Sequence, residues 1–167
     1  MLISNETNTL LNLLVQQGFI LNRLWDRGLS ILNINFAMNN FEKIFHGGLA
    51  HKFPVDWSDT ISEIQSKYNI VTEYLETPTD VSVYSEPLEF FNKNLEYHKK
   101  TYNILCDAIK IAGETNDLNV QAELIEFMKI FNKFMNQAIL LVDKSKSFKD
   151  DYAMFDSMAD KFYIIGN

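Results

Sequence analysis

Three side chains that can ligate a metal, Glu42, His46 and His98, lie at helix-like positions among apolar residues. Glu42 and His46 are four residues apart, which places a carboxylate and an imidazole one turn apart on a helix. His98 falls on the apolar stripe of a second predicted helix. Imidazole nitrogen and carboxylate oxygen are ligands for transition metals. We therefore predict a metal site in which Glu42, His46 and His98 meet across a bundle.

Ordinary structural interpretations of these residues stay open. Glu42 and His46 also suit a hydrogen bond or ion pair on a helix surface, and His98 suits a buried imidazole with a single polar partner. His51 lies close to two glycines, where we expect an exposed loop side chain. Cys106 adjoins an apolar stripe and is expected to be a packed thiol rather than a nucleophile.

The acidic pair Asp59 and Glu63 has the same four-residue spacing but a different environment. Each residue turns a helix by about 100°, so the pair points away from the apolar side that contains Trp57 and Ile61. We expect both carboxylates to face water, unless they bind metal across a subunit interface. The sequence contains no phosphate-binding loop, dinucleotide fingerprint, nucleophile elbow or CxxC pair.

Composition favours one all-helical domain over residues 1–167. The chain is 47% hydrophobic, and its 6 Gly and 3 Pro are too few for the many turns of an all-β protein. The net charge of -7 weighs against nucleic acid as a partner. Charged and amide residues interrupt every apolar run, so no membrane span is expected. A single Cys and the absence of a signal-peptide pattern predict a cytoplasmic protein.

Apolar periodicity predicts six helices. The first begins near Thr7 and stops or kinks at Gly28, and the second runs from Leu29 to Leu49. The glycines and Pro54 predict a turn over 47–54. The remaining helices are expected after this turn up to about Val71, over 87–112, over 118–141, and as a short helix over 152–162.

One connection is much longer than the others. Residues 76–87 lack helical periodicity and can span about 40 Å when extended, whereas a helix of about 20 residues is about 30 Å long. A short hinge, "GETND", joins the two helices that follow. Two helical hairpins joined by a bundle-length crossover are therefore expected, which is the connectivity of ferritin-like bundles.

Several short motifs carry a resemblance over about 29–144. The "PLE" start, Leu95-Glu96 followed by Lys99-Lys100, and the Asn116-Asp117 hinge resemble the third and fourth helices of bacterial ferritins. "SDTISE" is similar to an acidic segment of miniferritins, and "LAHKFP" resembles uncharacterised bacterial ferritin-like proteins. The resemblance implies an all-α, ferritin-like four-helix bundle with a long crossover between its second and third helices, here with extra N-terminal and C-terminal helices. It also implies iron or another transition metal as the cofactor.

The chain departs from the ferritin pattern at the metal ligands. Ferritin-like di-iron sites use a Glu on each of two helices and a Glu-x-x-His pair on each of the other two. No such pair occurs here, and His98 stands where the third helix would supply its Glu. Phe131 and Asn132 stand where the fourth would supply a Glu-Gln pair. We expect no intact di-iron motif.

Two functions follow as hypotheses. The first is a ferritin-like bundle that binds iron or another transition metal at the atypical site of Glu42, His46 and His98. The alternative is a metal-free bundle that acts in self-assembly or partner binding, because the first and last helices carry apolar stripes beyond those that a four-helix core needs. A homo-oligomer is expected in either case, and no catalytic residue is assigned.

Overall fold

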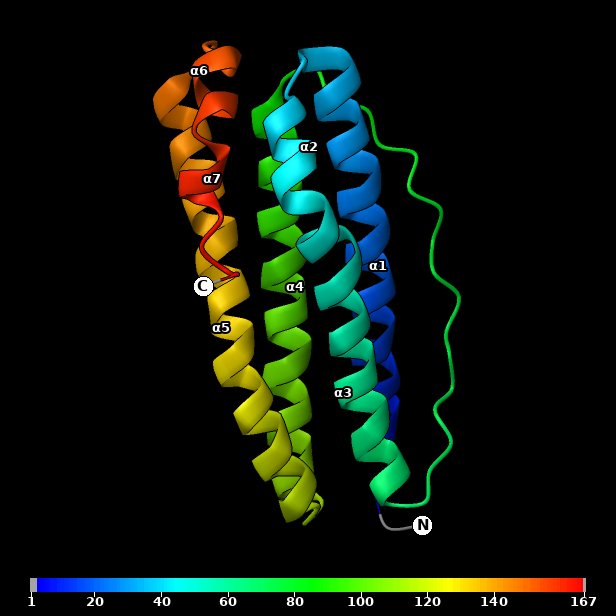
Figure 1. The fold of residues 1–167 in the computed structure, drawn as a ribbon. Coiled ribbons are helices and arrows are strands. Elements are labelled where there is room, and N and C mark those ends of the chain that lie inside the picture. The colour runs from blue at the N-terminus through cyan, green and yellow to red at the C-terminus, as the bar shows by residue number, and fades with distance from the viewer. Residues whose placement is uncertain (1–2, 167) are drawn as a thin grey trace.

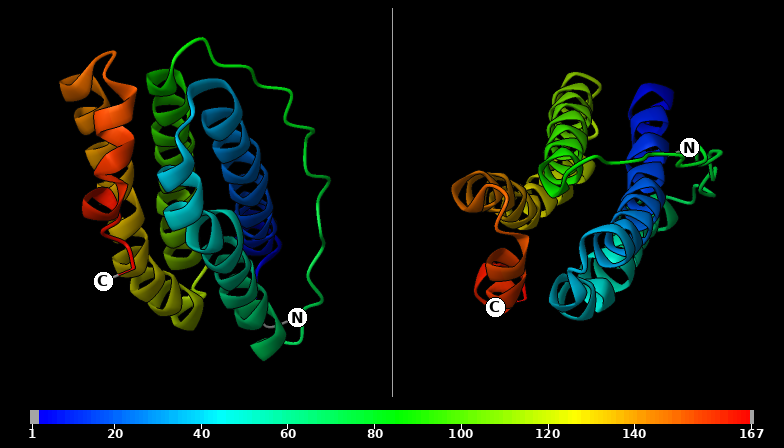
Figure 2. Two further views of the ribbon diagram at one scale, coloured as in Figure 1. Left: turned by 45° about the horizontal axis from the view of Figure 1, so that its top comes forward. Right: turned by 90° about the horizontal axis from the view of Figure 1, so that it is seen from above.

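Two antiparallel helix pairs, tied by one extended strap, form the computed structural model, which describes residues 3–166 (Figure 1). Viewed from above, α1 lies beside α2 and α3, and α4 lies beside α5 (Figure 2). The elements in chain order are α1 (Asn5–Phe36), α2 (Asn39–Phe45), the π-helix η1 (His46–Lys52), α3 (Phe53–Lys67), α4 (Pro87–Glu114), α5 (Leu118–Phe148), α6 (Tyr152–Ser157) and α7 (Ala159–Phe162).

The first helix is longer than predicted, because α1 continues through Gly28 to Phe36. The predicted stop at Gly28 is wrong. A Cβ at this position would lie 2.1 Å from the ring of Phe90, so the glycine serves the close approach of α1 and α4. The helix ends where Ala37 takes a left-handed conformation with φ 54°.

The second rod of the bundle consists of α2, η1 and α3 without a break (Figure 1). The predicted turn over 47–54 is therefore wrong. Pro54 has no N–H to donate to the carbonyl of Ala50, as an α-helix would require. The π-helix widens the rod just before this proline, and the side-chain amide of Asn22 donates to the Ala50 carbonyl instead. Because α2, η1 and α3 form one rod, α1 is the first helix of the bundle. The prediction of an extra N-terminal helix outside the bundle is therefore wrong.

The strap, residues 68–86, runs along α1 from the end of α3 to the start of α4 (Figure 1). Side chains of α1 hold it, because Gln16 donates to the carbonyl of Glu76 at 2.6 Å and Asn12 accepts from the N–H of Glu73 at 3.2 Å. The predicted bundle-length crossover is confirmed, but it begins at residue 68 rather than 76, because α3 ends at Lys67 and Asn69 takes a left-handed conformation with φ 59°. The hinge between α4 and α5 lies where expected, with Asn116 at φ 64°.

The short C-terminal helices pack against both α5 and α2. The carboxylate of Asp156 accepts from the backbone N–H groups of Asn40 and Phe41, which caps the start of α2. Phe155 and Phe162 are buried at 1% and 4% exposure. The apolar stripes of the first and last helices are thus used inside the chain, which removes the sequence argument for self-assembly.

Helices account for all the regular structure in residues 3–166, with no strand among them. The predicted fold class, an all-α four-helix bundle with its long crossover between the second and third rods and a short C-terminal addition, is confirmed. Within this described range, no helix is both long and apolar enough to cross a bilayer.

Candidate metal site

The π-helix brings together two histidines that an α-helix would separate. Residues five positions apart point about 140° away from each other in an α-helix. The i to i+5 hydrogen bonding of η1 instead places His46 and His51 one turn apart. Their Nε2 atoms are 2.8 Å apart, a distance at which one ring donates a hydrogen bond to the other.

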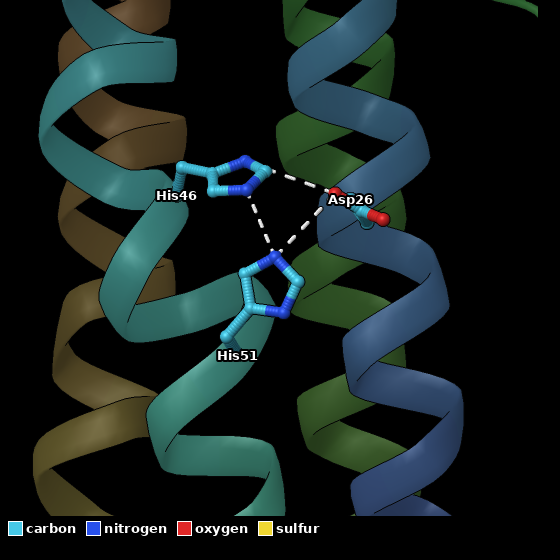
Figure 3. Close-up of side chains that lie close together, drawn as sticks. All are labelled: Asp26, His46 and His51. Carbon is cyan, nitrogen blue, oxygen red and sulfur yellow. Dashed lines mark hydrogen bonds and ion pairs between the residues drawn. The ribbon is translucent and has the colours of Figure 1, made fainter.

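A carboxylate from the neighbouring helix completes the group (Figure 3). Asp26 of α1 places its Oδ1 3.7 Å from His46 Nδ1 and 3.9 Å from His51 Nε2. One potential ligand atom from each of the three residues lies within 4.8 Å of the other two, an arrangement found once in the described chain. Glu42 flanks the group, with its Oε1 3.7 Å from His46 Nδ1.

The geometry suits a four-coordinate divalent metal with water in the open position. Metal–nitrogen bonds of 2.0–2.1 Å in a tetrahedral site separate ligand atoms by about 3.3 Å. The two Nε2 atoms are 2.8 Å apart and Asp26 Oδ1 is 3.9 Å from His51 Nε2, one distance on each side of this value, so small side-chain rotations would form the site. The side chains of Asp26 and His51 are each 52% exposed, which places the group on the outside of the bundle.

The Nδ1 atom of His46 is buried and has no hydrogen-bond partner. The carboxylates of Asp26 and Glu42 face it at 3.7 Å. Metal-ligating histidines usually donate their second ring N–H to a carboxylate, which fixes the ring orientation. With a metal on Nε2, His46 would have this arrangement with Glu42.

The structure brings Glu42 and His46 together but places His98 elsewhere. The His98 ring lies in the core against Trp57, Tyr97 and Phe131, and only 1% of the residue is exposed. Its Nδ1 is 2.7 Å from the carbonyl of Asn94, whereas its Nε2 has no partner. Burial lowers the pKa of His98 to about 4, although the hydrogen bond to Asn94 opposes this shift. The ring is neutral at pH 7.

Sequence reasoning missed Asp26 and gave His51 only a loop position. The available signal was the five-residue spacing of the two histidines around Gly47-Gly48, with a proline three residues further on. Asp59 and Glu63 are both exposed on α3, as predicted, and the structure adds no third ligand to them within the described residues.

Comparison with solved structures identifies the architecture. An open-pore ferritin from the archaeon Archaeoglobus fulgidus superposes with a TM-score of 0.84 at 12% identity, and the match covers 98% of each chain. A humanised archaeal ferritin gives 0.83 at 12% identity, covering 97% of this chain and 98% of that one. The chain has a ferritin-like fold. Sequence comparison matches no family model and no curated protein.

The interior of this ferritin-like fold does not fit the di-iron centre that the fold family implies. Such a centre needs several carboxylates converging in the core. Among residues 3–166, the buried polar side chains are amides, hydroxyls, one imidazole and the single carboxylate of Asp156, which caps α2. Trp57, His98 and Phe131 pack against one another in the core.

His98 gives folding stability a defined pH dependence. An unfolded histidine titrates near pH 6.5, whereas the folded pKa of His98 is about 4. Between these values only the unfolded state binds the proton, so the free energy of unfolding should fall by about 3 kcal/mol as the pH drops from 6.5 to 4. Urea unfolding at several pH values measures this slope, and His98→Gln should flatten it.

Asp117→Asn is the matched control for this slope. Burial raises the pKa of Asp117, but hydrogen bonds from Thr7, Thr115 and Ser4 outweigh burial and lower it, which moves its titration to more acidic pH. The control should therefore lose stability overall and keep the slope between pH 6.5 and 4. If His98→Gln has the same slope as the wild type, His98 is not the cause of the pH dependence.

Proposed function

We propose that this ferritin-like protein binds one divalent transition metal ion per chain, Fe(II) or Zn(II), at Asp26, His46 and His51. The observation that carries the proposal is the 2.8 Å approach of two imidazole nitrogens beside a carboxylate, on a wide helical turn. Two imidazoles and one carboxylate form a donor set that both ions accept. π-Helical turns also occur frequently at functional sites.

Glu42 has the supporting role in this proposal. Its carboxylate lies one turn before His46 and faces the unpartnered Nδ1 atom. Loss of such a partner typically lowers metal affinity by about 10- to 100-fold without removing a ligand. His98 takes no part, because its imidazole is packed among aromatic rings in the core.

Equilibrium dialysis of the metal-free protein against Zn(II) and anaerobic Fe(II), followed by elemental analysis, tests the site. We expect one ion per chain. His51→Ala should weaken binding by at least about tenfold, because it removes a ligand while touching no core contact. Glu42→Gln should weaken binding but keep the stoichiometry.

Asp59→Asn supplies a matched control, since it removes an exposed carboxylate from the outer side of α3. Its affinity should equal that of the wild type. If the double variant His46→Ala, His51→Ala binds as much metal as the wild type does, the proposed site is wrong.

Self-assembly is a second candidate function, now supported by a different surface. Four apolar strap residues are strongly exposed, namely Val71 at 90%, Val83 at 82%, Val81 at 76% and Tyr74 at 65%. Spaced along one extended segment, these side chains offer apolar contact surface to a neighbouring copy of the chain. We propose that the strap forms contacts between copies of the chain in a homo-oligomer.

Light scattering tests this second candidate. The wild type should have a mass that is a multiple of 19.4 kDa. The double variant Val71→Glu, Val83→Glu should lower the measured mass toward that of a single chain. Ile139→Glu on α5 should leave the mass unchanged. A wild type that is monomeric at all concentrations contradicts assembly through the strap.

A further inference from the structure

A cavity of about 320 Å³ lies beneath the middle of the strap, between α1 and α4. Residues 78–82 of the strap cover it, and the facing turns of the two helices form its floor. Its volume is at the lower end of the range for small-molecule sites. The cavity is distinct from the candidate metal site, to which no residue of its lining belongs.

The charge of the cavity is opposite to that of the whole chain. Arg23, Lys93 and Lys100 line it, against the single carboxylate of Asp80. The lining therefore has a net charge of +2, from three cations and one anion, in a chain whose net charge is -7. A concentration of positive charge in an acidic protein indicates a site for an anion.

Asp80 is already satisfied by the strap and its neighbours. Its side chain is 14% exposed, with Oδ1 3.6 Å from Lys93 Nζ and 3.9 Å from Arg27 Nε. The backbone N–H of Ser82 also donates to this oxygen at 2.9 Å. Burial raises the pKa of Asp80, but the hydrogen bonds from Ser82 and the charge of Lys93 together outweigh burial and lower the pKa below its usual value. The carboxylate is therefore ionised at pH 7.

Two cations remain without an anionic partner. Arg23 and Lys100 take part in none of the ion pairs formed within the described residues, although both line the cavity. Arg27 and Lys93 hold the strap in place by binding Asp80 and Ser82. In the cavity, the charge of Asp80 is therefore neutralised by Lys93 and Arg27, while the charges of Arg23 and Lys100 are available to a ligand.

The rest of the lining is largely apolar. Ile20 and Leu24 of α1, Val81 of the strap and the Tyr97 ring of α4 form most of it. The Tyr97 hydroxyl donates to the carbonyl of Gln17 at 2.5 Å, which leaves the aromatic ring as its contribution. Inorganic anions would gain nothing from these walls, whereas a ligand with an aliphatic body would bury apolar surface against them.

We propose that this strap cavity binds a small amphiphilic monocarboxylate. Its carboxylate lies between Arg23 and Lys100, and its aliphatic body lies against Ile20, Leu24 and Val81. The guanidinium group of Arg23 can bind both carboxylate oxygens, while Lys100 adds a point charge. This inference does not depend on metal binding.

Calorimetric titration with octanoate, octanol and acetate separates the two contributions. Octanoate should bind with a stoichiometry of one per chain. Octanol lacks the charge and acetate lacks the apolar body, so each should bind at least about tenfold more weakly. Equal binding of octanol and octanoate, or of acetate and octanoate, would overturn the proposal, as would no binding of octanoate.

Substitutions locate the binding site. Arg23→Gln and Lys100→Gln should each lower octanoate affinity by about tenfold, because each removes a charge that faces the carboxylate. Lys99→Gln is the matched control, since Lys99 is the exposed neighbour of Lys100 and does not line the cavity. All three side chains are exposed, so the variants should fold. An equal loss of affinity in all three would indicate general charge attraction and contradict the site.

Discussion

A short π-helical segment in the second rod of the bundle determines the geometry of the candidate metal site. Pro54 cannot donate a hydrogen bond to Ala50, and the rod continues past it because η1 widens and Asn22 takes the free carbonyl. The same widening aligns His46 and His51. Backbone accommodation of one proline therefore creates the geometry on which the candidate metal site depends.

In a di-iron protein the metal-ligating carboxylates lie in the core, whereas in this protein the core is aromatic and the metal-ligating groups lie on the surface. Several buried carboxylates are costly unless a metal compensates their charge. Here aromatic rings and a neutral His98 fill that space, so the core is stabilised by packing without a metal. Charged and metal-ligating groups lie instead on the outer faces of α1, η1 and the strap.

Loop length and periodicity were sufficient to predict the bundle, its crossover and the α4–α5 hinge, because these depend on local patterns. Gly28 and the 47–54 segment were misread, since glycine and proline normally interrupt helices. Only the tertiary contacts with Phe90 and Asn22 override that preference. Of the residues grouped in the candidate site, Glu42 and His46 share a local helix face that the sequence reveals, whereas Asp26 joins them from α1 through a contact that the sequence does not encode locally.

Anomalous diffraction at the zinc absorption edge, from crystals of the zinc-loaded protein, tests the central claim most directly. The account predicts one strong peak per chain, within bonding distance of His46, His51 and Asp26, with η1 retained as a π-helix. A peak in the core beside His98, or a regular α-helix through residues 46–52 with no zinc between the two histidines, would contradict it.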